Sequence, residues 1–289
     1  MVSKKFKSIK GEDVMKIKYQ QILGIILLLI TTTLSGCVSD NVSAAEIKMH
    51  TLDSSIKINS YRFLMNMEVS TEMGESKMTM TSNANGAVDV LNNKLMMDMS
   101  TTIPGSTNMN MLYYIVEEVV FIKMDYFGSD QWMQMNFSDY NISWDTYDQM
   151  NMQIDLLDYG EVERLDDEVI NNIDCYVLKI IPDFEKLYEI LMNQQGLSTG
   201  IPQDTYFSEM IDEFSLKIWI SKDNNLIIKA YEHMSMDLNL FGYSYSMSLE
   251  MDIRFFEYNE PVLIELPAEA QDSIDYSDYI YESYSYSPA

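Results

Sequence analysis

The chain has 289 residues, of which 45 are acidic and 19 are basic, and its formal net charge is −26. So negative a surface repels the phosphate backbone of nucleic acids, whose binding requires clustered Lys and Arg side chains. The composition therefore excludes a nucleic-acid partner.

The N-terminal segment has the layout of a secretory signal peptide. Lys16 and Lys18 precede an apolar run at residues 22–30, which is too short to cross a bilayer because a spanning helix needs ~20 apolar residues. The sequence Leu-Ser-Gly follows and leads directly to Cys37. This order resembles the lipobox of prokaryotic lipoproteins, which implies cleavage before Cys37 and a diacylglyceryl group on its sulfur. The alternative is a plain signal anchor with an incidental cysteine.

We therefore expect residues 1–36 to be a lipoprotein signal peptide and residues 37–45 to be a short polar tether. The rest of the protein is then expected on the extracytoplasmic face of the cell membrane, where lipid anchors it. With Cys37 assigned to lipid, Cys175 has no second cysteine to pair with, and we predict no disulfide. Cys175 lies in an apolar, strand-like run, where a free cysteine behaves as a small hydrophobic residue.

The domain is predicted to begin with a helix and then to change to strands. Met49, Leu52 and Ile56 are spaced as on one face of a helix within residues 46–59. From Tyr61 onward the apolar period becomes two, which is typical of strands with one apolar face and one face in water. Short turns separate the successive runs, at residues 73–75, 91–93, 104–106 and 127–130. This pattern predicts an antiparallel meander.

In the middle of the chain the spacing of the apolar residues changes again. Residues 138–157 have an apolar stripe at helical spacing, with Ser143 or Asp139 as the expected N-cap. A hairpin is expected next, between residues 160 and 181, with its turn at residues 170–172.

A second amphipathic helix is predicted from Asp183 to Gly196, and residues 196–204 form a loop that is a candidate lid. Residues 271–289 have no apolar period, so we predict a disordered, acidic Tyr/Ser tail. The last three strands are expected at residues 214–220, 226–236 and 243–255.

Two segments carry a more specific likeness. Residues 217–229, KIWISKDNNLIIK, form a predicted hairpin, and residues 259–267, NEPVLIELP, close the domain. With the strand pattern they resemble the LolA-like lipoprotein superfamily (LolA, LolB and LppX/LprG-type lipoproteins) and archaeal lipoproteins with Met-rich strands. The resemblance covers residues 46–270. It implies an α+β fold in which a strongly curved antiparallel sheet of about eleven strands, a half-barrel, has helices covering its concave face.

From the lipobox and the resemblance together we expect a lipid-anchored protein that holds a lipid or another hydrophobic ligand between sheet and helices, without catalysis and without a cofactor. Methionine suits such a lining because its flexible, polarizable side chain adapts to irregular apolar guests. The candidate lining residues are Phe63, Met65, Met67, Met97, Met99, Met109, Met111, Trp144, Phe184, Leu187 and Leu191.

Two alternatives stay open. In the first, helices and side chains fill the concave side completely, and the protein is a structural or interaction lipoprotein of the envelope. In the second, the Met-x-Met pairs bind Cu(I) through their thioethers. Because a spacing of two residues is also the ordinary period of a strand, we predict no metal site. The sequence has no hydrolase, zinc, calcium or phosphate-binding motif, and it indicates no protein partner.

The lipobox assignment gives a first prediction. Cys37→Ser should move the protein from the membrane fraction to the medium or to an uncleaved precursor, because stable attachment depends on the lipid carried by this sulfur. Fractionation and the mass of the N-terminus would measure the change. A Cys37→Ser protein that is processed and partitions like the wild type would contradict the assignment.

Overall fold

The computed structural model describes residues 42–74, 76–106, 108–125, 131–140, 143–187, 211–240 and 243–276. The predicted signal peptide, Cys37, Leu191 and the candidate lid lie outside these residues. Helix α2 (Ala44–Ser55) begins within the range assigned to the tether. It starts there because the Ser43 hydroxyl caps it and accepts a hydrogen bond from the Glu46 amide at 3.2 Å.

Thirteen strands form one sheet in the part of the chain that the structure describes, compared with the roughly eleven expected. The excess comes from very short strands such as β8 and β13. The strands are β1 (Ser60–Met73), β2 (Ser76–Asp89), β3 (Lys94–Thr102), β4 (Met109–Val116), β5 (Val119–Asp125), β6 (Trp132–Asn136), β7 (Glu161–Arg164), β8 (Glu168–Ile170), β9 (Ile173–Ile181), β10 (Ile211–Ser221), β11 (Ile227–Leu240), β12 (Tyr243–Phe256) and β13 (Ile274–Asp275).

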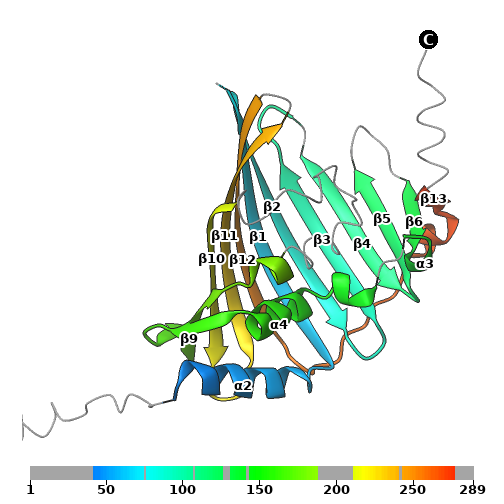
Figure 1. The fold of residues 1–289 in the computed structure, drawn as a ribbon. Coiled ribbons are helices and arrows are strands. Elements are labelled where there is room, and N and C mark those ends of the chain that lie inside the picture. Colours follow the sequence, from blue (N-terminus) through cyan, green and yellow to red (C-terminus); the bar gives the residue numbers. More distant parts are fainter. Residues whose placement is uncertain are drawn as a thin grey trace, which may run out of the picture. The chain divides into compact units, whose positions relative to one another are not determined.

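The sheet is centred on β1 and β12, which pair although they stand at opposite ends of the domain's sequence. Strands β2 to β6 follow in order on the far side of β1. On the far side of β12 lie β11, β10, β9 and β7, and β8 also pairs with β9. The ladders are antiparallel, except that β13 runs parallel to β6. The predicted α+β half-barrel is therefore confirmed, and Figure 1 shows a strongly curved sheet with a helix, α4, across its hollow side.

The chain stays regular beyond residue 271, where we expected the disordered tail to begin. After β12, at the centre of the sheet, it crosses to the β6 edge, forms the short helix η2 (Ala268–Asp272) and then adds β13 beside β6. Ala270 of η2 is fully buried. A two-residue parallel strand has no local sequence signal, because its pairing depends on a partner far away in the chain.

The helix expected at residues 138–157 is instead three short elements: α3 (Phe137–Tyr140), η1 (Trp144–Thr146) and α4 (Gln149–Tyr159). Neither of the expected caps is used for α4. Its N-cap is Asp148, whose carboxylate accepts hydrogen bonds from the amides of Met150 and Asn151 at 3.0 and 3.1 Å.

Tyr61 of β1 ties this cap to the sheet. Its hydroxyl donates a hydrogen bond of 2.6 Å to Asp148 and accepts one of 3.1 Å from the Met150 amide. Burial, followed by the Asp148 carboxylate, raises the pKa of Tyr61 well above its ordinary value, so the phenol stays a donor. The ring of Tyr61 also packs edge-on against Phe255 of β12 at 5.8 Å between centroids.

The C-terminal end of α4 is fixed by α2. The Lys48 amino group donates hydrogen bonds to the carbonyls of Asp158 and Gly160, at 2.7 and 3.0 Å, where the helix has unpaired backbone acceptors. Gly160 then turns the chain into β7 against β9, and a Cβ there would lie 2.5 Å from Ile180. Helix α4 therefore extends from β1 at the centre of the sheet to the β7–β9 edge.

The Tyr61–Asp148 contact gives the second prediction. Tyr61→Phe should lower the free energy of unfolding by ~1–3 kcal/mol, because the buried Asp148 carboxylate loses a donor while the ring is kept. Chemical denaturation would measure this. Tyr114→Phe is the matched control: this tyrosine is half-buried and its hydroxyl makes no hydrogen bond with a described residue, so its loss should leave stability nearly unchanged. Equal losses for the two variants would contradict the proposed role of the Tyr61 hydroxyl.

Candidate functional site

The two faces of the sheet differ in chemistry. Paired residues in a ladder lie on the same face of the sheet. The register therefore shows which residues of each strand share the face of Tyr61, the face on which α4 lies. We call this side the concave face. On β1 it carries Tyr61, Phe63, Met65 and Met67, while Arg62 and the other charged residues of β1 point to the opposite, convex face.

The structure places seven of the predicted lining residues on this face. Phe63 is fully buried, and the six strand methionines are half-buried. The ladders bring them together on β1, β3 and β4, with Met97 opposite Tyr113 and Met99 opposite Met111. The seven residues are Phe63, Met65, Met67, Met97, Met99, Met109 and Met111.

The remaining predicted lining residues come from the helical segments. Trp144 is half-buried in η1. Phe184 is half-buried and Leu187 buried in the helical turn at residues 184–187, which Asp183 caps through the Glu185 and Lys186 amides, at 2.9 and 3.2 Å. Leu191 lies outside the described residues, so its place in a site remains a prediction.

Small residues of β2 lie between the lining residues of β1 and β3. Ala84 stands between Met65 and Met99, and Gly86 stands between Phe63 and Met97. Gly86 lies opposite Phe63, and a Cβ at that position would come within 2.4 Å of the Phe63 ring. A glycine is needed here for close approach, so the Phe63 ring occupies the space over β2 at this level.

One carboxyl group interrupts the apolar surface. Glu232 of β11 lies between Leu216 of β10 and Met251 of β12, both buried, and is itself only 6% exposed. No described residue makes a hydrogen bond or an ion pair with it. Burial raises the pKa of Glu232 to about 7. Sequence reasoning missed this residue, although it stands in the apolar phase of the run between Ala230 and Met234.

One further buried polar side chain lacks hydrogen-bond partners among the described residues. Gln153 lies on the buried side of α4 with Met150 and Leu156, is fully buried, and has neither its amide nitrogen nor its oxygen bonded. The Tyr113 hydroxyl on the concave side of β4 has Tyr147 as a polar neighbour, without a hydrogen bond of normal geometry. Such groups are costly to bury. The burial of Gln153 could not be predicted from the sequence, because this residue simply occupies one position of the helical stripe of α4.

Two hollows lie near the helices. A cavity of about 210 Å³ adjoins the Tyr61–Asp148 contact and is bounded by Ile58 and Met150. A more open groove of about 690 Å³ lies between α2 and the start of β7, away from β1, β3 and β4. Charged residues (Lys48, Asp53, Glu161) and apolar residues (Met49, Leu52, Val162) line it together. The groove is therefore not part of the methionine surface.

Cys175 is structural in character, as expected. It is fully buried on β9, and its thiol donates a hydrogen bond to the Ile173 carbonyl at 3.2 Å. With Val177 and Trp219 it forms a small apolar cluster on the convex face. Burial raises the pKa of the thiol, which opposes a nucleophilic role.

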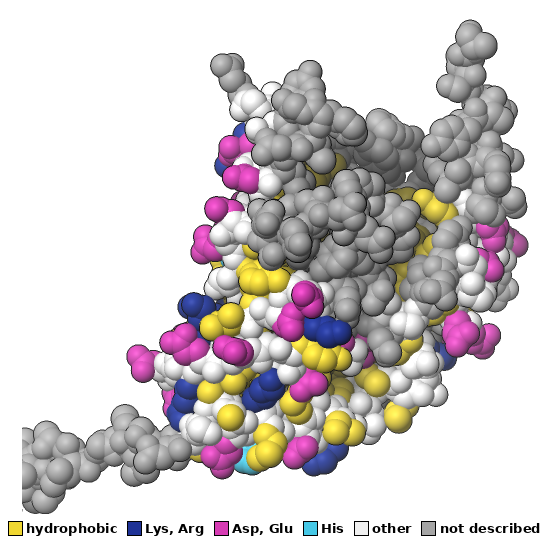
Figure 2. All heavy atoms as spheres, viewed as in Figure 1, with side chains coloured by type: hydrophobic (Ala, Val, Ile, Leu, Met, Phe, Trp, Pro, Cys, Tyr) yellow, Lys and Arg dark blue, Asp and Glu magenta, His cyan; other side chains and the backbone are white. Residues whose placement is uncertain are grey.

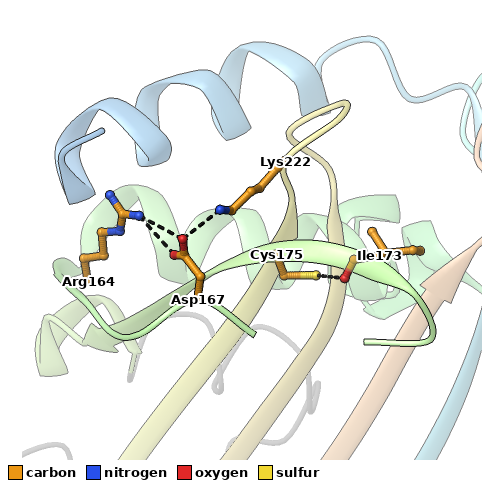
Figure 3. A network of polar contacts seen from close by, with 5 residues as sticks. All are labelled: Arg164, Asp167, Ile173, Cys175 and Lys222. Carbon is orange, nitrogen blue, oxygen red and sulfur yellow. Dashed lines mark hydrogen bonds and ion pairs between the residues drawn. The ribbon is translucent and has the colours of Figure 1, made fainter. Parts of the chain in front are cut away.

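A polar network fixes the chain beside this cluster (Figure 3). The Asp167 carboxylate accepts hydrogen bonds from Arg164 at 3.0 Å and pairs with Lys222, from the β10–β11 turn, at 2.7 Å. Burial opposes ionisation of Asp167, but the bonds from Lys222 and Arg164 outweigh it and lower the pKa. This network is a structural joint between the β7 edge and the β10–β11 hairpin.

The described residues contain no group of three or more His, Cys, Asp and Glu side chains that could hold a metal ion. The Met-x-Met pairs of the strands lie at alternate, same-face positions, while Met150 and Met152 lie on α4. Within the same part of the chain, no helix has the length and apolarity needed to span a membrane.

The fold and this face together define a half-barrel protein with an apolar, methionine-lined inner surface. The chain belongs to a family of unknown function (DUF6612), which matches residues 43–275. Comparison with curated protein sequences gives no match.

Among solved structures the chain is similar to lipoprotein LppX of Mycobacterium tuberculosis, with 15% identity and a TM-score of 0.42, over 78% of this chain and 100% of LppX. It is also similar to an outer membrane lipoprotein-sorting protein domain from Vibrio parahaemolyticus, with 12% identity, a TM-score of 0.28, and coverage of 79% and 98%. A DUF1329 family protein from Desulfovibrio piger has 12% identity, a TM-score of 0.29, and coverage of 77% and 95%. At these identities and TM-scores the likenesses carry no ligand or activity to this chain.

Glu232 gives the third prediction. In the unfolded chain its carboxyl ionises near pH 4.5, and in the folded protein near pH 7, so folding is opposed increasingly as pH rises through that window. Relative to Glu232→Gln, the wild type should lose roughly 3 kcal/mol of unfolding free energy between these two pH values and no more above them. Denaturation at several pH values would measure the difference.

The control is Glu68→Gln, which removes an exposed carboxyl from the convex side of β1. It should keep the wild-type pH dependence. A Glu232→Gln protein with the same slope as the wild type would show that Glu232 is ionised in the folded state like a surface residue.

Proposed function

We propose that this protein is a lipid-anchored, extracytoplasmic, non-enzymatic protein that binds a lipid or another hydrophobic molecule on its concave face. The anchor part rests on the lipobox at Cys37. The binding part rests on the inner surface of the sheet between β1 and β4.

The observation that carries the proposal is the incomplete burial of the strand methionines. Met65, Met67, Met97, Met99 and Met111 stand on the inner side of a curved sheet, yet each keeps an intermediate exposure. A core residue in such a position is normally buried and closely packed. Flexible thioether side chains that keep accessible surface in a hollow suit a guest of variable shape.

The alternative of a structural lipoprotein with a filled interior is supported by the buried end of the same face, where Tyr61, Phe63 and Val88 are fully buried. These residues lie near the Tyr61–Asp148 contact, at one end of the strands. We therefore assign packing to that end and ligand binding to the methionine surface beyond it.

The fourth prediction tests this division. Met67→Trp places bulk on the concave face, and in a ligand-binding protein it should lower the amount of bound lipid while leaving the melting temperature nearly unchanged. The measurement is paired: native mass spectrometry of protein extracted from its own membrane, and thermal unfolding of the same preparation.

The matched control is Leu64→Trp, which places the same bulk at an exposed, convex position of β1, three residues before Met67. It should change neither quantity. In a protein with a filled interior Met67→Trp would instead overpack the core at a cost of ~1–3 kcal/mol, and the lipid content would not change. That outcome would exclude the binding proposal.

A further inference from the structure

Glu232 has an ionisable side chain at a position where its neighbours on the sheet are apolar. On the described parts of β1, β11 and β12 every other Asp, Glu, Lys, Arg and His occupies a convex position: Arg62, Glu68, Glu72, Lys229, His233, Asp237, Glu250, Asp252 and Arg254. Glu232 alone faces inward there, with 6% of its surface exposed.

The other buried carboxylate among the described residues has partners that explain it. Asp148 caps α4 and binds the Tyr61 hydroxyl. Asp252 forms an ion pair of 2.7 Å with Lys229. Each of these contacts stabilises a junction in the fold. Glu232 makes no such contact with a described residue, so its position has no structural benefit to offset its burial.

We propose that Glu232 selects a cationic amphiphile as ligand: an aliphatic chain lies against the methionine surface, and an amine or ammonium group pairs with the Glu232 carboxylate. This inference rests on the proposed function and specifies its ligand class. The register supplies the geometry, because Met251 and Met67 follow Glu232 across the sheet in the same row of the concave face.

Electrostatics favours a cation over the other headgroups. An ammonium group both neutralises the carboxylate and donates hydrogen bonds to it in an apolar site, where such a pair is strong. A fatty acid would instead bring a second carboxyl group beside the first, which disfavours ionisation of both. The net charge of −26 adds attraction for cations, and Figure 2 shows acidic side chains spread over the side that carries α4.

Among the described neighbours of Glu232 on the sheet, none competes for its charge. Leu216 on β10 and Met251 on β12 oppose it, and Ala230 and Met234 flank it on β11, and none of the four titrates. Burial, which raises its pKa to about 7, keeps the free carboxyl largely protonated below neutral pH. Binding of an ammonium ligand should therefore strengthen as pH rises and Glu232 ionises.

The experiment compares three ligands with the same chain: dodecylamine, dodecanol and dodecanoate. Full-length wild type, Glu232→Gln and Glu68→Gln are purified in one non-ionic detergent, and native mass spectrometry measures the bound fraction of each ligand. At about pH 8 the wild type should prefer the amine, and Glu232→Gln should lose about tenfold or more of its amine affinity while its dodecanol affinity is kept. Glu68→Gln, which removes the same charge from the convex face, should match the wild type.

The outcomes separate this inference from the function on which it rests. If the wild type binds dodecanol but Glu232→Gln keeps full amine affinity, the selection of a cation by Glu232 is wrong while hydrophobic binding stands. An equal loss of amine affinity and dodecanol affinity in Glu232→Gln leads to the same conclusion, because the residue then affects the shape of the site and does not distinguish ligands by charge. If none of the three ligands binds the wild type, both proposals are wrong.

Discussion

The arrangement of this domain depends on one buried contact, the Tyr61 hydroxyl against the Asp148 carboxylate. The same carboxylate begins α4, so a single side chain fixes where the helix starts and where it meets the sheet. Lys48 holds the opposite end of α4 through backbone carbonyls. With both ends held by polar contacts, the buried side of α4, which carries Met150 and Leu156, is positioned over the sheet.

The strand pattern was predictable because it is local. An apolar period of two, interrupted by short turns, specifies antiparallel hairpins, and the turn at Asn171 and Asn172 has the positive φ angles, 52° and 66°, that asparagine tolerates. The start of α4 was not predictable in the same way. Ser143 and Asp148 are both good caps, and the choice between them is made by Tyr61, which is distant in sequence.

In the candidate site, too, one part could be predicted from local sequence and another part depends on distant residues. Membership of the concave face follows from strand phase, so Met65 and Met97 could be named from the sequence alone. Burial depends on what lies above the sheet, which phase does not encode. Glu232 is an example. Its position on the concave face follows from the alternation between Ala230 and Met234, but its lack of a partner among the described residues depends on the register of the neighbouring strands.

The pairing of β1 with β12 also has a consequence for how the chain folds. Strands β1 to β6 form by successive short-range hairpins, which close quickly because little chain entropy is lost. The outer side of β1, in contrast, stays an open edge until β12 arrives from the far end of the domain, and β6 waits for β13 in the same way. We expect the late-arriving C-terminal strands to limit the folding rate, so a half-made chain exposes two strand edges and is the species most prone to aggregate.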